Sequence, residues 1–181
     1  MKILIINGHP YRKKNLSELL SENYAKLKKK EGHEVKILKL VDLKFDFISE
    51  DIYSRELETD LKKAQKNIYW ADHLVFFYPL WWGEMPSLLK SFLERTLIPG
   101  FAFKYVNGKP KKLLKGKSAQ FFCTAGGNKF YTSSIGKIDQ IRTLGKILFF
   151  CGIKIKKIKI FPSIHKDLKK ERIDYIFKKL K

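Results

Sequence analysis

The chain has 181 residues, of which 44% are hydrophobic and 14% aromatic. This supply of apolar side chains suffices for a packed core in one domain and excludes global disorder. Lysine and arginine outnumber aspartate and glutamate by 38 to 18, which gives a formal net charge of +20. A basic chain attracts phosphates, so nucleic-acid binding is one interpretation. The lysines are spread along the chain, which favours solvated lysine-rich faces, and we expect no nucleic-acid partner.

The sequence also bears on compartment and redox state. The longest apolar run, 74–82, is broken by Pro79 and is far shorter than the ~20 residues that a membrane span needs. Strand-like residues follow Met1 directly, without the series typical of a signal peptide. Cys123 and Cys151 lie in apolar runs, which indicates reduced thiols and neither a disulfide framework nor a zinc site. These features predict a cytoplasmic protein.

The first part of the chain predicts a strand, a helix and a second strand. Residues 2–7 form a continuous apolar run that ends at turn residues, which is typical of a buried strand in a parallel sheet. Asn15 is the expected N-cap of a helix, with Glu18 as its capping-box partner, and Gly32 ends that helix. Residues 34–40 alternate between apolar and polar side chains and predict a strand nearer the edge.

The middle of the chain continues this alternation of helices and strands. A polar helix is expected over 54–68, and a third strand over 74–78. The next helix begins at about Glu84 or Pro86, since proline suits the first turn. Residues 101–117 form a basic loop, in which Asn107-Gly108 indicates a two-residue hairpin.

The last part predicts two more strands and two more helices. Strands are expected over 118–124 and 153–161, with helices over 138–150 and 167–180. Strands that alternate with helices throughout predict an α/β fold: a doubly wound, five-stranded parallel sheet with helices on both faces. No repeat or linker divides the chain, so one domain over residues 1–181 is expected.

Ligands of such sheets bind beyond the carboxyl ends of the strands, where three loops of this chain carry unusual residues. The loop 8–17 runs into a helix N-terminus, which presents unpaired amides and a positive dipole end to a phosphate, and its Arg12-Lys13-Lys14 adds charge. Its spacing matches neither the Rossmann nor the P-loop pattern. His9 either bonds within its own loop or contacts the ligand.

The other two loops offer an aromatic pair and a glycine pair. Trp81 and Trp82 form an aromatic cap on the core, a partner interface, or a platform for a planar ring, and Gly83 lets the backbone approach closely. Gly126-Gly127 forms either a plain turn or a nest of amides that favours negative charge. A phosphate-binding loop, an aromatic platform and an anion nest at one edge together indicate a flavin mononucleotide site.

The chain resembles the flavodoxin-like NAD(P)H:quinone oxidoreductases, including bacterial drug-activity modulators and flavoproteins ancillary to potassium-efflux systems. The resemblance rests on Gly8-His9-Pro10, on PLWWGEMPSLLK at 79–90, on Glu94-Arg95 with Gly100-Phe101-Ala102-Phe103, and on Thr124-Ala125-Gly126-Gly127. It implies a flavodoxin-like fold and ping-pong, two-electron hydride transfer from NAD(P)H to a quinone or related acceptor. The implied cofactor is FMN, which suits the compact loop at Arg12-Lys13-Lys14, with FAD as the alternative.

The resemblance also implies roles for single residues. The implied cofactor-binding residues are His9, Asn15, Leu16, Ser17, Glu18, Pro79, Leu80, Trp81, Trp82, Gly83, Thr124, Ala125, Gly126 and Gly127. The Gly126 and Gly127 amides are implied to stabilise negative charge on the ring, and Tyr131 to shield or donate to the acceptor. Some relatives add a histidine after the double glycine, but here none occurs between His73 and His165.

A homodimer is implied as well, with the flavin near an interface to which Trp81 and the aromatic run 101–105 would contribute. The alternative function is that of a regulatory flavoprotein subunit that binds a membrane potassium-efflux transporter. A small electron-transfer flavodoxin is disfavoured, because those proteins are usually acidic and this chain carries +20.

Overall fold

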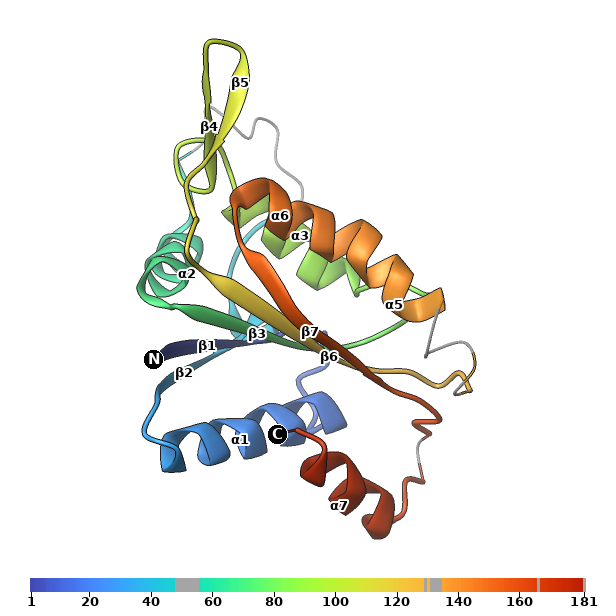
Figure 1. Ribbon diagram of the computed structural model, residues 1–181. Coiled ribbons are helices and arrows are strands. Elements are labelled where there is room, and N and C mark those ends of the chain that lie inside the picture. Colours follow the sequence, from blue (N-terminus) through green and yellow to red (C-terminus); the bar gives the residue numbers. More distant parts are fainter. Residues whose placement is uncertain (48–55, 129, 131–134, 166, 181) are drawn as a thin grey trace.

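A sheet of five parallel strands forms the centre of the computed structural model, which describes residues 1–47, 56–128, 130, 135–165 and 167–180 (Figure 1). The strand order is β2-β1-β3-β6-β7, and every neighbouring pair is parallel. The strands are β1 (Lys2–Asn7), β2 (Glu34–Lys39), β3 (His73–Pro79), β6 (Ser118–Thr124) and β7 (Lys154–Phe161). The predicted doubly wound, five-stranded parallel sheet is therefore confirmed.

Helices cover both faces of this sheet (Figure 1). One face carries α1 (Leu16–Lys30) and α7 (Lys170–Lys178). The other carries α2 (Thr59–Trp70), α3 (Ser87–Thr96), α5 (Ile135–Gln140) and α6 (Lys146–Cys151), the last two joined by a π-helical segment, η2 (Ile141–Gly145). A short 3-10 helix, η1 (Leu40–Asp42), follows β2. None of the described helices combines the length and the apolar character needed to cross a bilayer, and the compartment stays a prediction.

The apolar strands divide their side chains between two cores. Successive side chains of a strand point to opposite faces, so a continuous apolar run supplies both. In β1, Leu4 and Ile6 join the core beneath α2, α3 and α6, whereas Ile3 and Ile5 join the core beneath α1 and α7. These alternating, fully buried residues hold the strand ends, and hence the loops that follow them, in fixed positions.

The structure shifts several predicted element boundaries and resolves a loop. The last helix, predicted over 167–180, spans only Lys170–Lys178. The predicted helix over 54–68 begins only at Thr59; residues 56–58 are not helical, and 54 and 55 lie outside the described residues. There Glu58 accepts two hydrogen bonds, of 3.0 and 2.9 Å, from the buried Arg95 of α3. The predicted helix over 138–150 begins at Ile135 and includes the π-helical segment. The expected loop 101–117 contains a hairpin.

That hairpin consists of β4 (Phe103–Val106) and β5 (Lys109–Lys112), which are antiparallel. Asn107 and Gly108 connect them with φ values of 51° and 74°. Two successive positive φ angles define a type I′ turn, whose twist matches that of the flanking strands. The hairpin signal at Asn107-Gly108 is therefore confirmed.

Acid should destabilise this fold through His73 at the start of β3. His73 is 8% exposed, and its Nδ1 lies 2.8 Å from Ser118 Oγ. Burial lowers the pKa of His73 below its ordinary value of 6.5, and Lys28 and Lys156 lower it further, against hydrogen bonds that raise it. The unfolded chain then binds more protons than the folded chain, so the free energy of unfolding should fall as the pH drops below about 6.5.

Urea unfolding at a series of pH values between about 5 and 8 measures this decline. The variant His73→Asn should show a shallower decline than the wild type, since one group with a lowered pKa is gone. An identical pH dependence in the two proteins would remove His73 as a cause.

Candidate functional site

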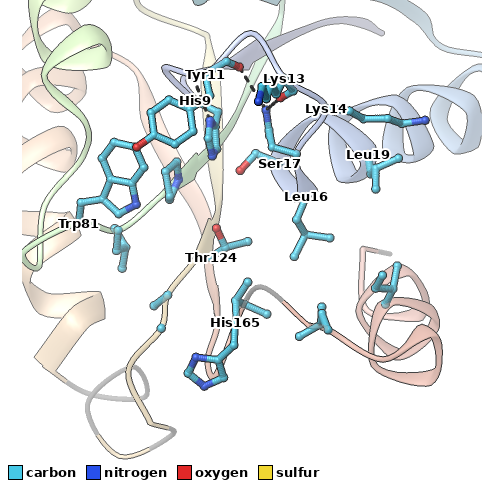
Figure 2. Close-up of a pocket in the computed structure, with 18 residues that line it drawn as sticks. His9, Tyr11, Lys13, Lys14, Leu16, Ser17, Leu19, Trp81, Thr124 and His165 are labelled. Atoms are coloured by element: carbon cyan, nitrogen blue, oxygen red, sulfur yellow. Dashed lines mark hydrogen bonds between the residues drawn. The ribbon is translucent and has the colours of Figure 1, made fainter.

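A pocket of about 560 Å³ lies at the carboxyl edge of the sheet, where β1, β3, β6 and β7 end (Figure 2). Its volume falls in the range of small-molecule sites, ~300–1,000 Å³. The loop after β1 and α1 contribute His9, Tyr11, Lys13, Lys14, Asn15, Leu16, Ser17 and Leu19, and the loops after β3 and β6 contribute Pro79, Leu80, Trp81, Thr124, Ala125 and Gly126. The segment after β7 and α7 contribute Ile164, His165, Leu168 and Ile173.

The three loops singled out from the sequence thus converge on one pocket. Ten of the expected residues line it, namely His9, Asn15, Leu16, Ser17, Pro79, Leu80, Trp81, Thr124, Ala125 and Gly126. Four expected residues do not line it: Glu18, Trp82, Gly83 and Gly127. Tyr131 lies outside the described residues, so its implied role stays a prediction.

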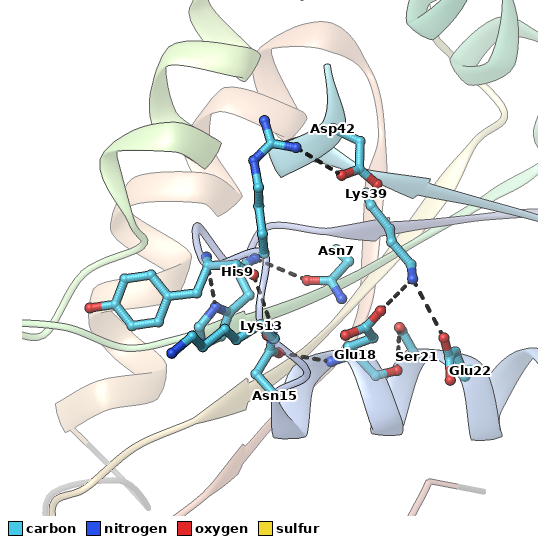
Figure 3. Close-up of polar contacts among 11 residues, drawn as sticks. Asn7, His9, Lys13, Asn15, Glu18, Ser21, Glu22, Lys39 and Asp42 are labelled. Atoms are coloured by element: carbon cyan, nitrogen blue, oxygen red, sulfur yellow. Dashed lines mark hydrogen bonds and ion pairs between the residues drawn. The ribbon is translucent and has the colours of Figure 1, made fainter. Parts of the chain in front are cut away.

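The loop after β1 is folded by its own side chains (Figure 3). Asn7 Oδ1 accepts a hydrogen bond of 3.0 Å from the His9 amide. Asn15 Oδ1 accepts one of 3.0 Å from the Glu18 amide, and Asn15 Nδ2 donates one of 3.0 Å to the Lys13 carbonyl, which confirms the N-cap. The amides of Leu16 and Ser17 have no intrahelical acceptor, because they belong to the first turn. They are therefore donors for a ligand.

The Ser17 hydroxyl is the most telling group at this end of the pocket. Ser17 is 1% exposed, yet its Oγ has no hydrogen-bond partner among the described residues, a state shared only with Thr96 Oγ1. A buried hydroxyl without a partner costs about 1–3 kcal/mol, which a bound acceptor would recover. With Lys13 and Lys14 beside it, Ser17 forms a cradle suited to an anion.

Glu18 is turned away from this cradle and binds β2 instead (Figure 3). Lys39 Nζ hydrogen-bonds to Glu18 Oε1 and lies 3.5 Å from Glu22 Oε1. The bond to Glu18 raises the pKa of Lys39. Glu18 lines a small hollow of about 120 Å³ behind the loop, which shares His9, Tyr11 and Asn15 with the main pocket, and its carboxylate is paired with Lys39 there.

Three rings form an aromatic wall of the pocket: His9, Tyr11 and Trp81. The Tyr11 and Trp81 ring centroids are 5.4 Å apart, and the His9 ring lies edge-on to both, at 5.2 and 5.8 Å. His9 Nδ1 accepts a hydrogen bond of 3.2 Å from the Tyr11 amide, which leaves Nε2 to carry the proton of the neutral ring. Burial lowers the pKa of His9, opposed by Glu18, and so favours this neutral donor.

His9 therefore combines both roles weighed from the sequence: it bonds within its loop and lines the pocket. Tyr11 was not among the expected site residues. Its position directly after Gly8-His9-Pro10, at a sheet edge already expected to bind a ring, is the signal that could have identified it.

A type I′ turn decides which tryptophan faces the pocket. The amides and carbonyls of Trp81 and Glu84 exchange two hydrogen bonds of 3.0 Å, and Trp82 and Gly83 have φ values of 54° and 83°. This geometry leaves the Trp82 side chain fully exposed, at 103%, while Trp81 joins the wall. Trp81 is thus the better candidate for the platform, and Gly83 contributes a backbone angle that other residues rarely adopt.

A buried glutamine holds this turn from behind. Gln140, at the end of α5, is 0% exposed; its Oε1 accepts a hydrogen bond of 2.7 Å from the Tyr78 hydroxyl, and its Nε2 donates one of 3.1 Å to the Gly83 carbonyl. The π-helical segment begins at the next residue, and such segments are frequent at functional sites. No sequence pattern pointed to Gln140, because its partners lie 62 and 57 residues away.

Backbone hydrogen bonds fix the loop after β6 to its neighbours. The Leu80 amide donates to the Thr124 carbonyl at 2.7 Å, and the Ile164 and Ser163 amides donate to the Ala125 and Gly127 carbonyls at 2.9 Å. These bonds use the carbonyls of the loop, so the Gly126 amide stays a candidate donor toward the pocket. Gly127 lies beyond the lining and serves the turn.

The wall after β7 was missed from the sequence. Ile164, Leu168 and Ile173 line the same pocket as Leu16 and Leu19 of α1, and together they add apolar surface to it. We call these five residues the apolar annexe. The signal was topological: β7 is parallel to the other strands, so its loop had to emerge at the same edge.

His165 of the same segment also lines the pocket (Figure 2). The sequence lacks a histidine after Gly126-Gly127, and the structure brings one in from the next loop instead. The thiols are not candidates for chemistry here. Burial raises the pKa of Cys123 to about 12 and that of Cys151 to about 11, so both stay protonated near neutral pH.

Comparisons with known proteins agree with this arrangement. The chain is 29% identical over 172 residues to an uncharacterized NAD(P)H oxidoreductase of Haemophilus influenzae, covering 91% of this chain and 85% of that one. It is 34% identical over 117 residues to human ribosyldihydronicotinamide dehydrogenase [quinone]. That match covers 61% of this chain and 51% of the human protein.

A solved structure shows the same fold. An FMN-dependent NADH-azoreductase from Bacillus anthracis, in complex with FMN, superposes with a TM-score of 0.76 at 21% identity, covering 99% of this chain and 95% of that one. A family model described as a flavodoxin-like fold (Flavodoxin_2) matches residues 1–177. Because that match spans nearly the whole sequence, the chain belongs to the flavodoxin-like family.

Proposed function

We propose that this chain, as one flavin-binding domain, is an NAD(P)H:quinone oxidoreductase with FMN in the pocket at the carboxyl edge. The observation that carries the proposal is the buried Ser17 hydroxyl without a partner, at a helix N-terminus in the same pocket as an aromatic wall. A bound flavin would supply the two-electron chemistry, taking a hydride from NAD(P)H and passing it to the acceptor.

The residues present fit both ends of FMN. Ser17 Oγ, the first-turn amides of α1 and the lysines at 13 and 14 suit a phosphate. Trp81 and Leu80 offer a flat apolar surface for the ring. The Gly126 amide, with that of Gly127 beside it, would direct partial positive charge at negative charge on the ring.

The relatives support the substrates. The Haemophilus protein is named for NAD(P)H, the human one for a quinone and the Bacillus one for FMN. His165, which lines the pocket, is the candidate to orient an acceptor or hold a proton, and Tyr131 keeps the role that the resemblance implies. The azoreductase extends the class of acceptors to test from quinones to azo compounds.

FAD is kept as the alternative cofactor because of the apolar annexe. A terminal phosphate needs no apolar surface beyond it, whereas the adenine of FAD would bury against Leu16, Leu168 and Ile173. Mass spectrometry of the flavin released from the purified protein separates the two.

A homodimer is part of the proposal, with an interface that differs from the expected one. In the run 101–105, Ala102 is buried and Phe103 half-buried, while Tyr105 is 62% exposed. The centroid of the Phe103 ring lies 4.9 Å from that of Phe150 of α6 and 5.8 Å from that of Tyr105. We call Phe103, Tyr105 and Phe150 the aromatic patch, and propose that it meets a second copy.

The regulatory alternative uses the same flavin pocket. A subunit that binds a membrane potassium-efflux transporter would also hold FMN, so the flavin does not distinguish the two functions. Co-purification with a transporter subunit is the observation that would favour regulation over a free-standing reductase.

The phosphate cradle is tested by Ser17→Ala. The purified chain should bind FMN in a spectral titration, and Ser17→Ala should weaken that binding by about 10- to 100-fold, the loss expected for a hydrogen bond to a charged group. The stability of the flavin-free protein should not fall, because the lost hydroxyl has no partner there. Thr96→Val, which removes the other unpartnered hydroxyl, is the matched control and should leave FMN affinity unchanged. Failure of the wild type to bind either FMN or FAD would refute the proposed function.

The role of Gln140 is tested by Gln140→Leu. The change removes the side-chain donor to the Gly83 carbonyl and the acceptor of the Tyr78 hydroxyl, which should lower stability by about 1–3 kcal/mol and loosen the turn that carries Trp81. FMN affinity should fall with it. Gln65→Leu breaks a comparable bond, of 2.9 Å to the Thr96 carbonyl, away from the pocket. Gln65→Leu should lower stability but leave FMN affinity unchanged. If Gln140→Leu and Gln65→Leu bound FMN equally well, the role assigned to Gln140 would be contradicted.

The aromatic patch is tested by Tyr105→Asp. Sedimentation velocity should find the wild type as a dimer and the variant as a monomer, because a carboxylate in an apolar interface is costly to desolvate. Tyr69→Asp alters a tyrosine of α2 that is 73% exposed, and should leave the dimer intact. A wild type that is monomeric at micromolar concentration would exclude this interface.

A further inference from the structure

A second pocket, of about 540 Å³, lies along the outer edge of the sheet. β7 is the edge strand, with α5 and α6 on one side and α7 on the other (Figure 1). The pocket is lined by Lys137 of α5, by residues 157–162 of β7 and the following turn, and by Arg172, Tyr175 and Lys179 of α7. We call it the edge pocket. It shares no lining residue with the flavin pocket, from which α7 separates it.

The lining of the edge pocket carries positive charge alone. No carboxylate lines it. Five cationic side chains do: Lys137, Lys157, Lys159, Arg172 and Lys179. The strand and helix that form it belong to the half of the chain where positive charge is concentrated. Residues 95–181 contain 22 of the 38 lysines and arginines but only 4 of the 18 aspartates and glutamates. Glu171 and Asp174 of α7 are among those four, and neither lines the pocket.

The cations at the α7 side are positioned but not neutralised. Lys159 Nζ donates a hydrogen bond of 2.6 Å to the Lys179 carbonyl, and Arg172 Nη2 donates one of 3.0 Å to the Pro162 carbonyl. The Arg172 guanidinium and Lys179 Nζ lie 5.1 and 5.6 Å from the centre of the Tyr175 ring. Within the described part of the chain, no ion pair with a carboxylate involves Lys159, Arg172 or Lys179.

One lysine of the edge pocket, Lys159, has a lowered pKa. Burial lowers the pKa of Lys159, and the nearby charges of Lys157 and Lys179 lower it further. The other described lysine with a lowered pKa, Lys117, lies outside the edge pocket and donates hydrogen bonds to two backbone carbonyls. An anion in the edge pocket would remove this repulsion, so its binding would stabilise the folded chain.

We propose that the edge pocket binds a small oligophosphate anion, with two or more linked phosphate groups. Phosphate oxygens match both the ammonium groups of lysine and the planar fork of Arg172. Linked phosphates suit the site because its cations are spread from α5 to α7, and one phosphate would reach only some of them. The concave shape favours a small molecule over duplex DNA or a flat membrane. The proposal does not depend on the chemistry assigned to the flavin pocket.

The test is calorimetric titration of the full chain with inorganic tripolyphosphate in excess FMN, which under the proposed function would occupy the cradle at Ser17 and keep tripolyphosphate out of it. We expect one ion bound per chain, with an affinity that falls as salt is raised. Lys159→Gln with Arg172→Gln should weaken binding by at least about tenfold, since two charged hydrogen bonds are lost. Orthophosphate should bind the wild type more weakly than tripolyphosphate.

The matched control is the double variant Lys104→Gln with Lys109→Gln. It removes two positive charges from the β4-β5 hairpin, which lies at the opposite end of the molecule from α7 (Figure 1). It should retain wild-type affinity. Should the first double variant fail to fold in a thermal melt, Lys137→Gln with Lys179→Gln replaces it with the same expected loss. Equal weakening in edge and hairpin variants would overturn the proposal in favour of diffuse attraction. A wild type that does not bind tripolyphosphate would also overturn it. So would duplex DNA or phosphatidylserine vesicles that bind the wild type more tightly than tripolyphosphate does and that lose affinity in the edge variant.

Discussion

The last backbone hydrogen bonds of the parallel sheet decide where the candidate site lies. Each is made just beyond or at a strand end: the Gly8 amide to the Phe77 carbonyl at 2.8 Å, Leu80 to Thr124 at 2.7 Å, and Ala125 to Phe161 at 2.9 Å. They join the loops after β1, β3, β6 and β7 into one continuous rim. Since register is set by strands buried on both faces, the loops cannot slide apart without exposing the cores.

This constraint explains what the sequence could and could not predict. Apolar runs gave the strands, and their parallel order placed His9, Trp81 and Gly126 at one edge, as the pocket confirms. The choice of Trp81 over Trp82 depends on two positive φ angles, which no apolar pattern encodes. Gln140 depends on contacts across some sixty residues of chain. Side chains placed by the sheet were predictable, and those placed by turn geometry or long-range hydrogen bonds were not.

The two pockets use positive charge in different ways, with α7 as the wall between them. At the rim, a buried hydroxyl and helix amides lie beside the lysines at 13 and 14, so fixed hydrogen-bond donors accompany the charge. At the edge, the donors are long cationic side chains, and burial together with the charges of Lys157 and Lys179 lowers the pKa of one of them, Lys159. Ile173 faces one pocket while Arg172 and Tyr175 face the other, so a shift of α7 would be felt in both.

Trp82 shows how strongly the rim is determined by the surrounding structure. A bulky residue at positive φ costs about 1–3 kcal/mol, and its exposed ring gains nothing from burial in the monomer. The turn nevertheless forms, because two backbone bonds within it and the bond from Gln140 to the Gly83 carbonyl hold it. The pocket therefore requires the shape of this turn, and the Trp82 side chain follows from it. The Trp82 ring, exposed beside the candidate pocket, is then available for contact with another molecule rather than with the core.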